Sequence, residues 1–236
     1  MTVLRHEEFE KGCEATCNGP YDGKWSKTMI GYGPEDSHFV LEITYNYPID
    51  KYQLGNDFLG VTIGAPTEKI DEIKAKGEWQ EEKGQIWTSS PAGYKFFLEQ
   101  DDHLSIKGVS LATSSIASSL RFWNEMLDMK VLSKDENQIQ LTYDEAKQAT
   151  LRLVATPNGA AVDHATAFGR IAFALPTPDL PPLEKKIANA EGLGTVKTPL
   201  VVLPTPGKAD VQVIILEDPV SSIICQFVTS VMLFFF

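Results

Sequence analysis

The sequence predicts an α+β protein made of four βαβββ units in two pairs, with the first unit lacking its leading strand and helix. Two observations indicate this class: the two halves of the chain repeat one another, and each helical stretch is followed by several short strand-like runs. With 43% apolar residues among 236, the chain is long and apolar enough to bury a sizeable core.

The repeat is visible in matched segments. The opening MTVL aligns with MKVL at 129–132, FVLEITY aligns with ATLRLVA, and FLGVTI aligns with FGRIAF. In the second half, MKVL directly follows a strand (106–113) and a helix (116–129). The first half therefore begins inside a unit, as expected for an N-terminally truncated or alternatively spliced product.

The elements of the second half follow from periodicity. In the helix over 116–129, apolar residues recur every three or four positions, and Ser115 is a suitable N-cap. Short strands follow near 129–133, 139–143 and 150–155. The next unit has a strand at 169–176, a helix over 180–192 and three further strands, with alternating or continuous apolar runs.

The repeat sets the predicted domain boundaries. Residues 1–102 form a first, N-terminally incomplete domain, and 103–228 form a second. Residues 229–236, which read TSVMLFFF, form an apolar tail. We expect the preceding segment to be a buried edge strand and the tail to be irregular, because the whole apolar run is too short to span a bilayer.

Charge and cysteine content limit the function classes. A net charge of -11 and a pI near 4.8 disfavour a nucleic-acid partner or an anionic membrane surface. Three cysteines, two of them in C-x3-C, do not form a disulfide framework or a zinc motif. We expect reduced thiols, no signal peptide, and a cytoplasmic location, with mitochondria as a further possibility.

The βαβββ repeat, together with QLGNDF, VDHATAFGRIAF and TPGKADVQVIILEDP, resembles the vicinal oxygen chelate superfamily of glyoxalases, bleomycin resistance proteins and dioxygenases, and within it the animal glyoxalase-domain proteins. The resemblance extends to Pro219. It implies that two units form a cup around one divalent metal, zinc or nickel, held by the first and last strands of each unit. The implied activity is that of lactoylglutathione lyase, which isomerises the glutathione–methylglyoxal hemithioacetal and so detoxifies methylglyoxal.

The resemblance places two functional residues in LEITYNY. Glu42 matches the catalytic carboxylate that also binds the metal, and Asn46 matches a residue that helps to hold the glutathione adduct. The remaining ligand positions have changed. They carry Gly60, Phe97, Gly108, Arg152, Arg170 and Cys225.

Two of these departures suggest another use. Arg152 and Arg170 fall at adjacent positions of one predicted cup, where two guanidinium groups could bind an anionic substrate group. Glu99 has the strand parity to replace Phe97 as a ligand. The alternatives are structural: Glu42 as a solvent-facing strand residue, Arg170 in a surface ion pair, and His38, His164, Cys13 and Cys17 as ordinary surface or loop residues.

Two hypotheses follow. The first is a lactoylglutathione lyase-like enzyme with one divalent metal at Glu42. The second is a catalytically inactive scaffold of the same fold that binds a small anionic metabolite or a protein partner. The lost ligands favour the second, and metal content discriminates between them.

Overall fold

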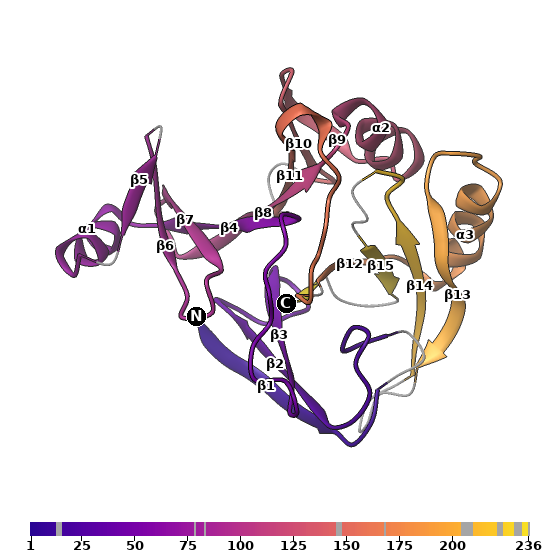
Figure 1. Cartoon of the computed structure of the whole chain (residues 1–236), viewed down its shortest axis with the longest axis horizontal. Helices are drawn as coiled ribbons and strands as arrows, with labels where there is room; N and C mark the ends of the chain where they lie inside the picture. The colour runs from indigo at the N-terminus through magenta and orange to yellow at the C-terminus, as the bar shows by residue number, and fades with distance from the viewer. Residues whose placement is uncertain are drawn as a thin grey trace.

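The strands of the computed structural model form two eight-stranded sheets, here called sheet A and sheet B (Figure 1). The described residues are 1–12, 16–77, 79–82, 84–144, 148–167, 169–203, 210–220, 224–228 and 233–235. Within them, no helix is long and apolar enough to cross a membrane.

Sheet B contains two complete βαβββ units. Its strands, in spatial order, are β5 (Gln80–Glu82), β6 (Gln85–Ser89), β7 (Lys95–Gln100), β4 (Phe58–Ala65), β8 (Ser105–Thr113), β11 (Thr150–Ala155), β10 (Gln138–Thr142) and β9 (Lys130–Lys134). The first strand of each unit lies parallel to the last strand of the same unit, as β4 to β7 and β8 to β11. The two first strands, β4 and β8, meet antiparallel at the centre.

Sheet A repeats this pattern with one substitution. Its strands, in spatial order, are β1 (Thr2–Phe9), β2 (Trp25–Gly31), β3 (Val40–Asn46), β16 (Leu233–Phe235), β12 (Arg170–Ala174), β15 (Ile224–Val228), β14 (Val211–Glu217) and β13 (Thr195–Leu203). β16 lies parallel to β3 and antiparallel to β12. It therefore occupies the place that a unit's own first strand holds elsewhere.

This arrangement corrects two expectations about the C-terminus. The segment after Pro219 contributes β15, which lies between β12 and β14 and is not an edge strand. The tail is not wholly irregular, because Leu233–Phe235 is a paired strand; positions 229–232 and 236 lie outside the described residues. The predicted boundary after residue 102 falls between β7 and β8, a connection that runs within sheet B.

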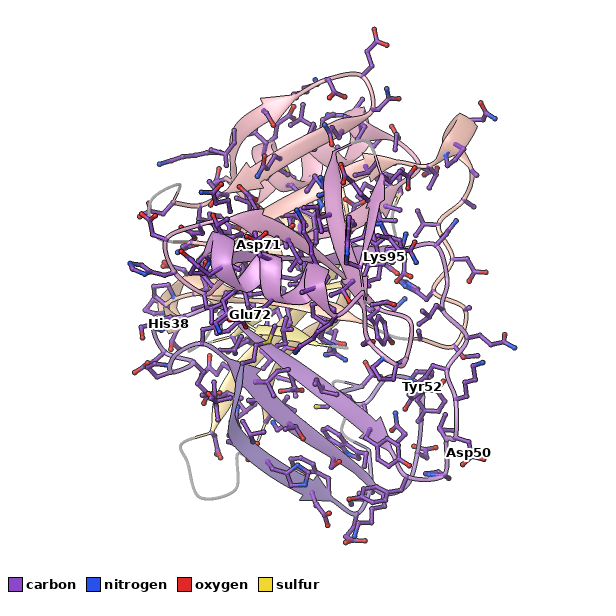
Figure 2. The ribbon with its side chains drawn as sticks, turned by 90° about the vertical axis from the view of Figure 1, so that its left-hand side faces the viewer. His38, Asp50, Tyr52, Asp71, Glu72 and Lys95 are labelled. Carbon is purple, nitrogen blue, oxygen red and sulfur yellow. The ribbon has the colours of Figure 1, made fainter. Side chains whose placement is uncertain are left out.

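Three helical segments cover the sheets in the described part of the chain. They are α1 (Thr67–Ala75), α2 (Ile116–Leu120), which continues as a π-helical stretch (Arg121–Met126), and α3 (Leu180–Ala188); single 3₁₀ turns lie at Pro157–Gly159 and Thr177–Asp179. The predicted N-cap is confirmed, since Ser115 Oγ accepts a hydrogen bond of 3.3 Å from the Ser118 backbone N–H. Figure 2 shows Asp71 and Glu72 on the outward side of α1, and both are exposed.

One hydrophobic core cluster joins the two sheets, and a second, smaller cluster lies within sheet A. Phe122 and Trp123 are fully buried between side chains of both sheets, such as Leu153 of sheet B and Leu216 of sheet A. The indole N–H of Trp123 donates to Asp218 Oδ2 at 2.8 Å, so the helix is also tied to the end of β14 by a buried hydrogen bond. The predicted apolar helix face therefore packs inward.

The two long connections between the sheets bond to each other. Asn56, just before β4, donates from Nδ2 to the Ala161 carbonyl at 3.0 Å and accepts from the Asp163 backbone N–H at 2.7 Å. His164 Nδ1 lies 2.6 Å from Asp57 Oδ2, which confirms the expectation of a satisfied loop histidine.

The cysteines differ from expectation. Cys17 is disulfide-bonded, so the prediction that all thiols are reduced is wrong. Cys225 is a buried free thiol, and Cys13 lies outside the described residues.

Candidate functional site

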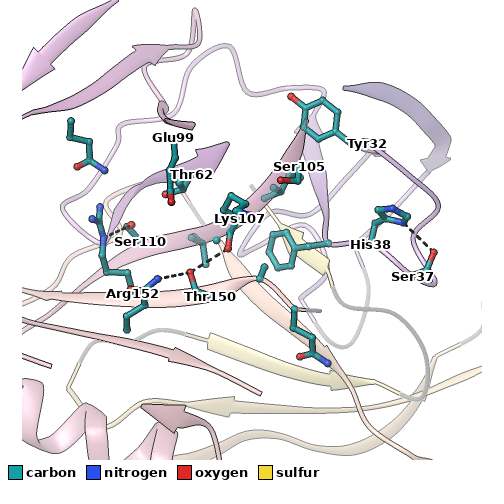
Figure 3. Close-up of a pocket in the computed structure, with 18 residues that line it drawn as sticks. Tyr32, Ser37, His38, Thr62, Glu99, Ser105, Lys107, Ser110, Thr150 and Arg152 are labelled. Atoms are coloured by element: carbon teal, nitrogen blue, oxygen red, sulfur yellow. Dashed lines mark hydrogen bonds between the residues drawn. The ribbon is translucent and has the colours of Figure 1, made fainter. Parts of the chain in front are cut away.

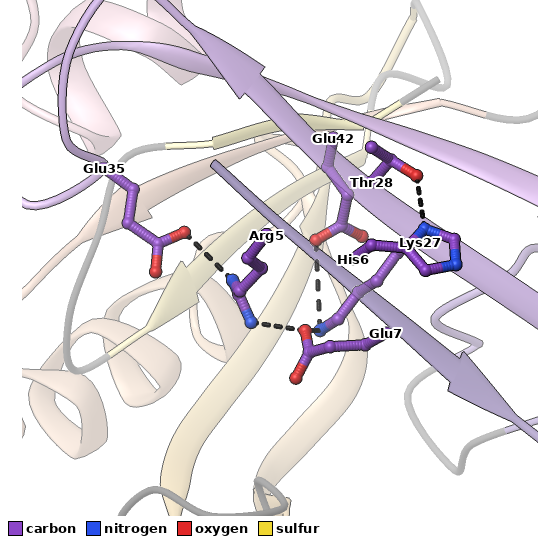
Figure 4. Close-up of polar contacts among 7 residues, drawn as sticks. All are labelled: Arg5, His6, Glu7, Lys27, Thr28, Glu35 and Glu42. Carbon is purple, nitrogen blue, oxygen red and sulfur yellow. Dashed lines mark hydrogen bonds and ion pairs between the residues drawn. The ribbon is translucent and has the colours of Figure 1, made fainter. Parts of the chain in front are cut away.

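Glu42 shares one face of sheet A with Val40, two residues before it in β3, and is only 1% exposed. No described residue donates a hydrogen bond to either carboxylate oxygen, and the Lys27 ammonium lies 4.0 Å from Oε2 (Figure 4). Burial raises the pKa of Glu42 to about 7, against the lowering effect of Lys27, Arg5 and Arg170. The solvent-facing alternative for Glu42 is wrong.

A charged cluster surrounds Lys27 on the same face. Glu7 Oε2 contacts Lys27 Nζ at 3.4 Å and also pairs with Arg5, whose Nη2 lies 3.0 Å from Glu35 Oε2 (Figure 4). The two cations thus already have carboxylate partners. Glu42 remains the carboxylate of this cluster that lacks a hydrogen-bond donor among the described residues.

Arg170, the first residue of β12, is 2% exposed, which rules out the surface ion pair. Its Nη1 donates to Gln226 Oε1 at 3.0 Å, and its Nη2 donates to the Thr16 carbonyl. Burial lowers the pKa of Arg170 to about 10, and the charge of Glu42 opposes that shift. Arg170 is therefore a buried cation fixed by neutral acceptors, with Glu42 as its electrostatic counterpart.

The strand register tests whether a metal fits in sheet A. Glu42 pairs with Phe235 of β16, and Phe235 pairs on its other side with Arg170, so the three form one row across the sheet. This row runs through a first strand and a last strand, where the resemblance expects ligands. A phenylalanine has no donor atom, and a guanidinium is a cation with no acceptor. The row offers one carboxylate, so these residues do not fit a divalent metal.

The rest of the described chain offers no alternative metal site. Among the described residues, no group of three or more His, Cys, Asp or Glu side chains is placed to hold a metal ion. Cys225, the predicted last-ligand position, belongs to the hydrophobic core, and its neighbour Gln226 is the residue that contacts Arg170.

Asn46 is the last residue of β3 and is 3% exposed. Its Oδ1 accepts from Asn18 Nδ2 at 2.8 Å, and its Nδ2 donates to Tyr52 Oη at 2.9 Å. These groups line a hollow of about 210 Å³ whose wall also includes Tyr94. The amide of Asn46 thus braces this wall, and its predicted role in substrate binding stays a prediction.

The larger hollow, about 480 Å³, lies on sheet B (Figure 3). Its floor comes from β4, β7, β8 and β11, and the connection between β2 and β3 contributes His38 and Tyr32 to its rim. It thus combines sheet B with residues of the first unit. Its volume falls in the range that small-molecule sites occupy.

Arg152 of β11 reaches into this hollow (Figure 3). Its Nε donates to Ser110 Oγ at 2.9 Å, and its guanidinium carbon lies 5.5 Å from the centre of the Phe97 ring. Partial burial lowers the pKa of Arg152, and the charge of Glu99 acts in the opposite direction. Neither Nη group has a hydrogen-bond or ion-pair partner among the described residues.

Other polar groups share the hollow. Glu99 of β7 and Thr62 of β4 line it, while the Lys107 ammonium on its edge already pairs with Asp101 Oδ2 at 2.8 Å. Thr62 and Ser110 were missed by the sequence reasoning. Each lies two positions after a glycine that was considered, Gly60 and Gly108, so strand parity alone could have identified them.

The structure separates residues that the sequence analysis grouped. Arg170 is in sheet A and Arg152 is in sheet B, so the expectation that both line one cup is wrong. Glu42 is likewise in sheet A, whereas Gly60 and Glu99 are in sheet B. The pairs that share a site are Glu42 with Arg170 and Glu99 with Arg152.

Several known proteins resemble this chain in sequence or in fold. Residues 115–231 match the family described as the glyoxalase domain-containing protein 4-like C-terminal domain. Glyoxalase domain-containing protein 4 of Mus musculus is 49% identical over 234 residues, covering 95% of this chain and 76% of that protein. Glyoxalase 1 of Caenorhabditis elegans is 46% identical over 228 residues, covering 95% and 78%. A glyoxalase I mutant from Zea mays superposes with a TM-score of 0.78 at 25% identity, covering 96% of this chain and 83% of that one.

Proposed function

The chain belongs to the glyoxalase domain-containing protein 4 family, and from this premise we propose that it binds a small anionic metabolite of the glutathione-adduct type in the hollow of sheet B. The observation that carries the proposal is Arg152, which lines this hollow with both Nη groups uncommitted among the described residues. A guanidinium with two parallel N–H donors matches a carboxylate.

The surroundings of Arg152 favour a ligand with two kinds of charge. Its Nε is held by Ser110 and its flat face lies over Phe97, so the Nη edge is oriented before a ligand arrives. Glu99 lines the same hollow and attracts an ammonium group. Glutathione adducts carry carboxylates and one ammonium, and thus suit both residues.

The side chains at the candidate sites support ligand binding, but they do not support metal-dependent turnover. Zinc or nickel would need several O, N or S donors, and the row through Glu42 supplies one carboxylate beside a buried guanidinium. The same conflict arises at Arg152 in sheet B. We therefore propose a protein of the glyoxalase fold that binds its ligand but does not turn it over with a metal.

Calorimetric titration with S-lactoylglutathione tests the proposal. Arg152→Gln should weaken binding by about 10-fold to 100-fold, the value of one charge-assisted hydrogen-bond pair. Arg121→Gln, which removes an exposed arginine paired with Glu125 on the helix, is the matched control and should leave the affinity unchanged. Equal affinity of the Arg152→Gln protein and the parent protein would refute the proposed site.

A second function, lactoylglutathione lyase-like isomerisation, is favoured by one specific observation. Glu42 keeps the family's carboxylate, and a pKa of about 7 suits a general base at neutral pH. A relative from Arabidopsis thaliana, called a probable chloroplastic lactoylglutathione lyase, is 32% identical over 127 residues and covers 48% of this chain and 36% of that protein.

The two functions give different results in a hemithioacetal assay run before and after chelator treatment, with metal analysis of the same sample. The scaffold proposal predicts less than stoichiometric zinc or nickel and no chelator-sensitive turnover. Turnover that is lost in Glu42→Gln and on chelation would establish the enzyme instead.

A further inference from the structure

The hollow of sheet B is elongated along β8. Ser105 and Ser110 both line it, and they are five positions apart on that strand. At the rise of a β-strand, their backbone positions are roughly 17 Å apart. Figure 3 shows Arg152 beside Ser110 at one end of the hollow and His38 at the other end. The hollow therefore suits an extended ligand better than a compact one.

The end at Arg152 carries two opposite charges that are not paired with each other. Glu99 follows Phe97 by two positions on β7, so the two side chains stand on one face, about 7 Å apart along the strand. The guanidinium of Arg152 lies over the Phe97 ring, and Glu99 makes no ion pair with it within the described residues. A guanidinium and a carboxylate separated in this way match the carboxylate and the ammonium of one amino-acid head group.

The opposite end carries His38, from the connection between β2 and β3. A Cβ added to Gly33 would lie 2.5 Å from His38 Nδ1 and 2.6 Å from Nε2, so the face of the imidazole ring packs on this glycine. In the ring plane, Nδ1 lies 3.1 Å from Ser37 Oγ. Nε2 has no hydrogen-bond or ion-pair partner among the described residues. The ring is thus oriented from two sides, and Nε2 is open to a ligand.

The positive charges around the hollow leave two groups for an anion. Among the described residues that line it, Arg152, Lys107 and His38 can carry a positive charge. The Lys107 ammonium already pairs with Asp101 Oδ2 at 2.8 Å. Arg152 and His38 therefore remain, one at each end of the hollow.

We propose that His38 binds the distal carboxylate of a peptide-like ligand whose amino-acid head group lies at Arg152 and Glu99. This inference rests on the proposed function and gives a glutathione adduct one orientation, with the γ-glutamyl group at Arg152 and the glycine carboxylate at His38. An extended chain of three residues spans about 10 Å, and a hydrogen bond of about 3 Å at each end brings the total to about 16 Å. This length matches the separation of Ser105 and Ser110.

The orientation also explains why a residue from sheet A belongs to a site in sheet B. The floor of the hollow comes from strands of sheet B, which provide Arg152 and Glu99 for the head group. The connection between β2 and β3 belongs to sheet A and adds His38. His38 is thus a specificity-determining residue, which distinguishes a ligand with two separated carboxylates from one with a head group alone.

Calorimetric titration with S-methylglutathione and with its glycine ethyl ester tests the His38 end. The ester lacks the distal negative charge, so the parent protein should bind it about 3-fold to 5-fold more weakly, the value of one charged contact at an exposed position. His38→Asn should bind S-methylglutathione more weakly by the same factor and should bind the two ligands equally. His6→Asn removes an exposed histidine of β1 that does not line the hollow, and this matched control should behave as the parent protein.

Titration with N-acetyl-S-methylglutathione, which lacks the ammonium group, tests the other end. The parent protein should prefer S-methylglutathione, and Glu99→Gln should remove this preference. His38→Asn should retain it, because His38 lies at the far end of the hollow. Arg152→Gln should bind all three ligands more weakly and should still prefer the free acid over the ester.

The results separate this inference from the proposed function. If S-methylglutathione binds neither the parent protein nor any variant, or binds Arg152→Gln as tightly as the parent protein, both fail. If Arg152→Gln weakens binding while His38→Asn still prefers the free acid over the ester, the orientation alone is refuted. Loss of that preference in Arg152→Gln instead of His38→Asn would show that the ligand lies in the reverse direction, and would also overturn the inference.

Discussion

The carboxyl of Glu42 makes the stability of the protein depend on pH. Burial raises its pKa from 4.5 to about 7, so the folded state holds this proton more tightly than the unfolded state. The resulting stabilisation is complete below about pH 4.5 and is lost as the pH rises through about 7. The shift corresponds to about 3 kcal/mol.

The variant Glu42→Gln isolates this effect, because the amide is similar in shape and does not ionise. As the pH rises from 5 to 8, we expect the unfolding free energy of this variant to rise by about 2.5 kcal/mol relative to that of the parent protein. Urea unfolding at both pH values measures this difference. Glu72→Gln on the exposed side of α1 is the control and should show no such gain (Figure 2). A pH-independent difference for Glu42→Gln would contradict the burial argument.

The helix that follows β8 starts at a side-chain cap. Ser115 Oγ accepts from the Ser118 backbone N–H, one of the donors that a helix start leaves unsatisfied. The α-helical part is only five residues long before the π-helical stretch. Because this part is little more than one turn, the cap bond is a large share of its hydrogen bonding. Packing of Trp123 then holds the helix against both sheets.

Replacement of Ser115 tests how much this cap stabilises the protein. Ser115→Ala should lower the unfolding free energy by about 1 kcal/mol, since the cap bond is lost. Ser115→Asp retains an acceptor and should keep most of the stability. Chemical denaturation of the three proteins is the measurement, and an alanine variant as stable as the parent protein would argue against this cap.

The two inter-sheet connections hold the molecule together at the largest scale. Gly55 lies against the opposite connection so closely that an added Cβ would sit 1.8 Å from the Asp163 carbonyl oxygen. The neighbouring hydrogen bonds of Asn56 depend on this approach. The requirement for glycine here is steric, because any side chain would separate the connections.

Gly55→Ala should therefore lower the unfolding free energy by at least about 2 kcal/mol, the usual cost of forcing atoms into a closed contact. Gly77→Ala is the comparison: its Cβ would meet nothing within 4 Å, and only its positive φ of 72° is unfavourable, at roughly 1–2 kcal/mol. Thermal unfolding followed in both variants measures the difference. A Gly55→Ala protein no less stable than Gly77→Ala would show that the connections separate without cost.

Local sequence signals predicted much of this fold. The repeat gave the βαβββ units, the apolar spacing around Trp123 gave the buried helix face, and Ser115 gave the helix start. These features depend on residues that are near one another in the chain. The matched positions also pointed to Glu42, Arg152 and Arg170 as candidate site residues, although not to which of them lie in the same sheet.

The sequence alone thus determined the unit type, the family resemblance and the loss of most metal donors. Only the tertiary structure decided that the first unit pairs with the fourth and the second with the third, which places Glu42 in one row with Arg170 and Glu99 in one hollow with Arg152. It also placed residues 233–235 between β3 and β12. Strand pairing across such distances depends on which open edges remain to be filled, and that is a property of the assembled sheets.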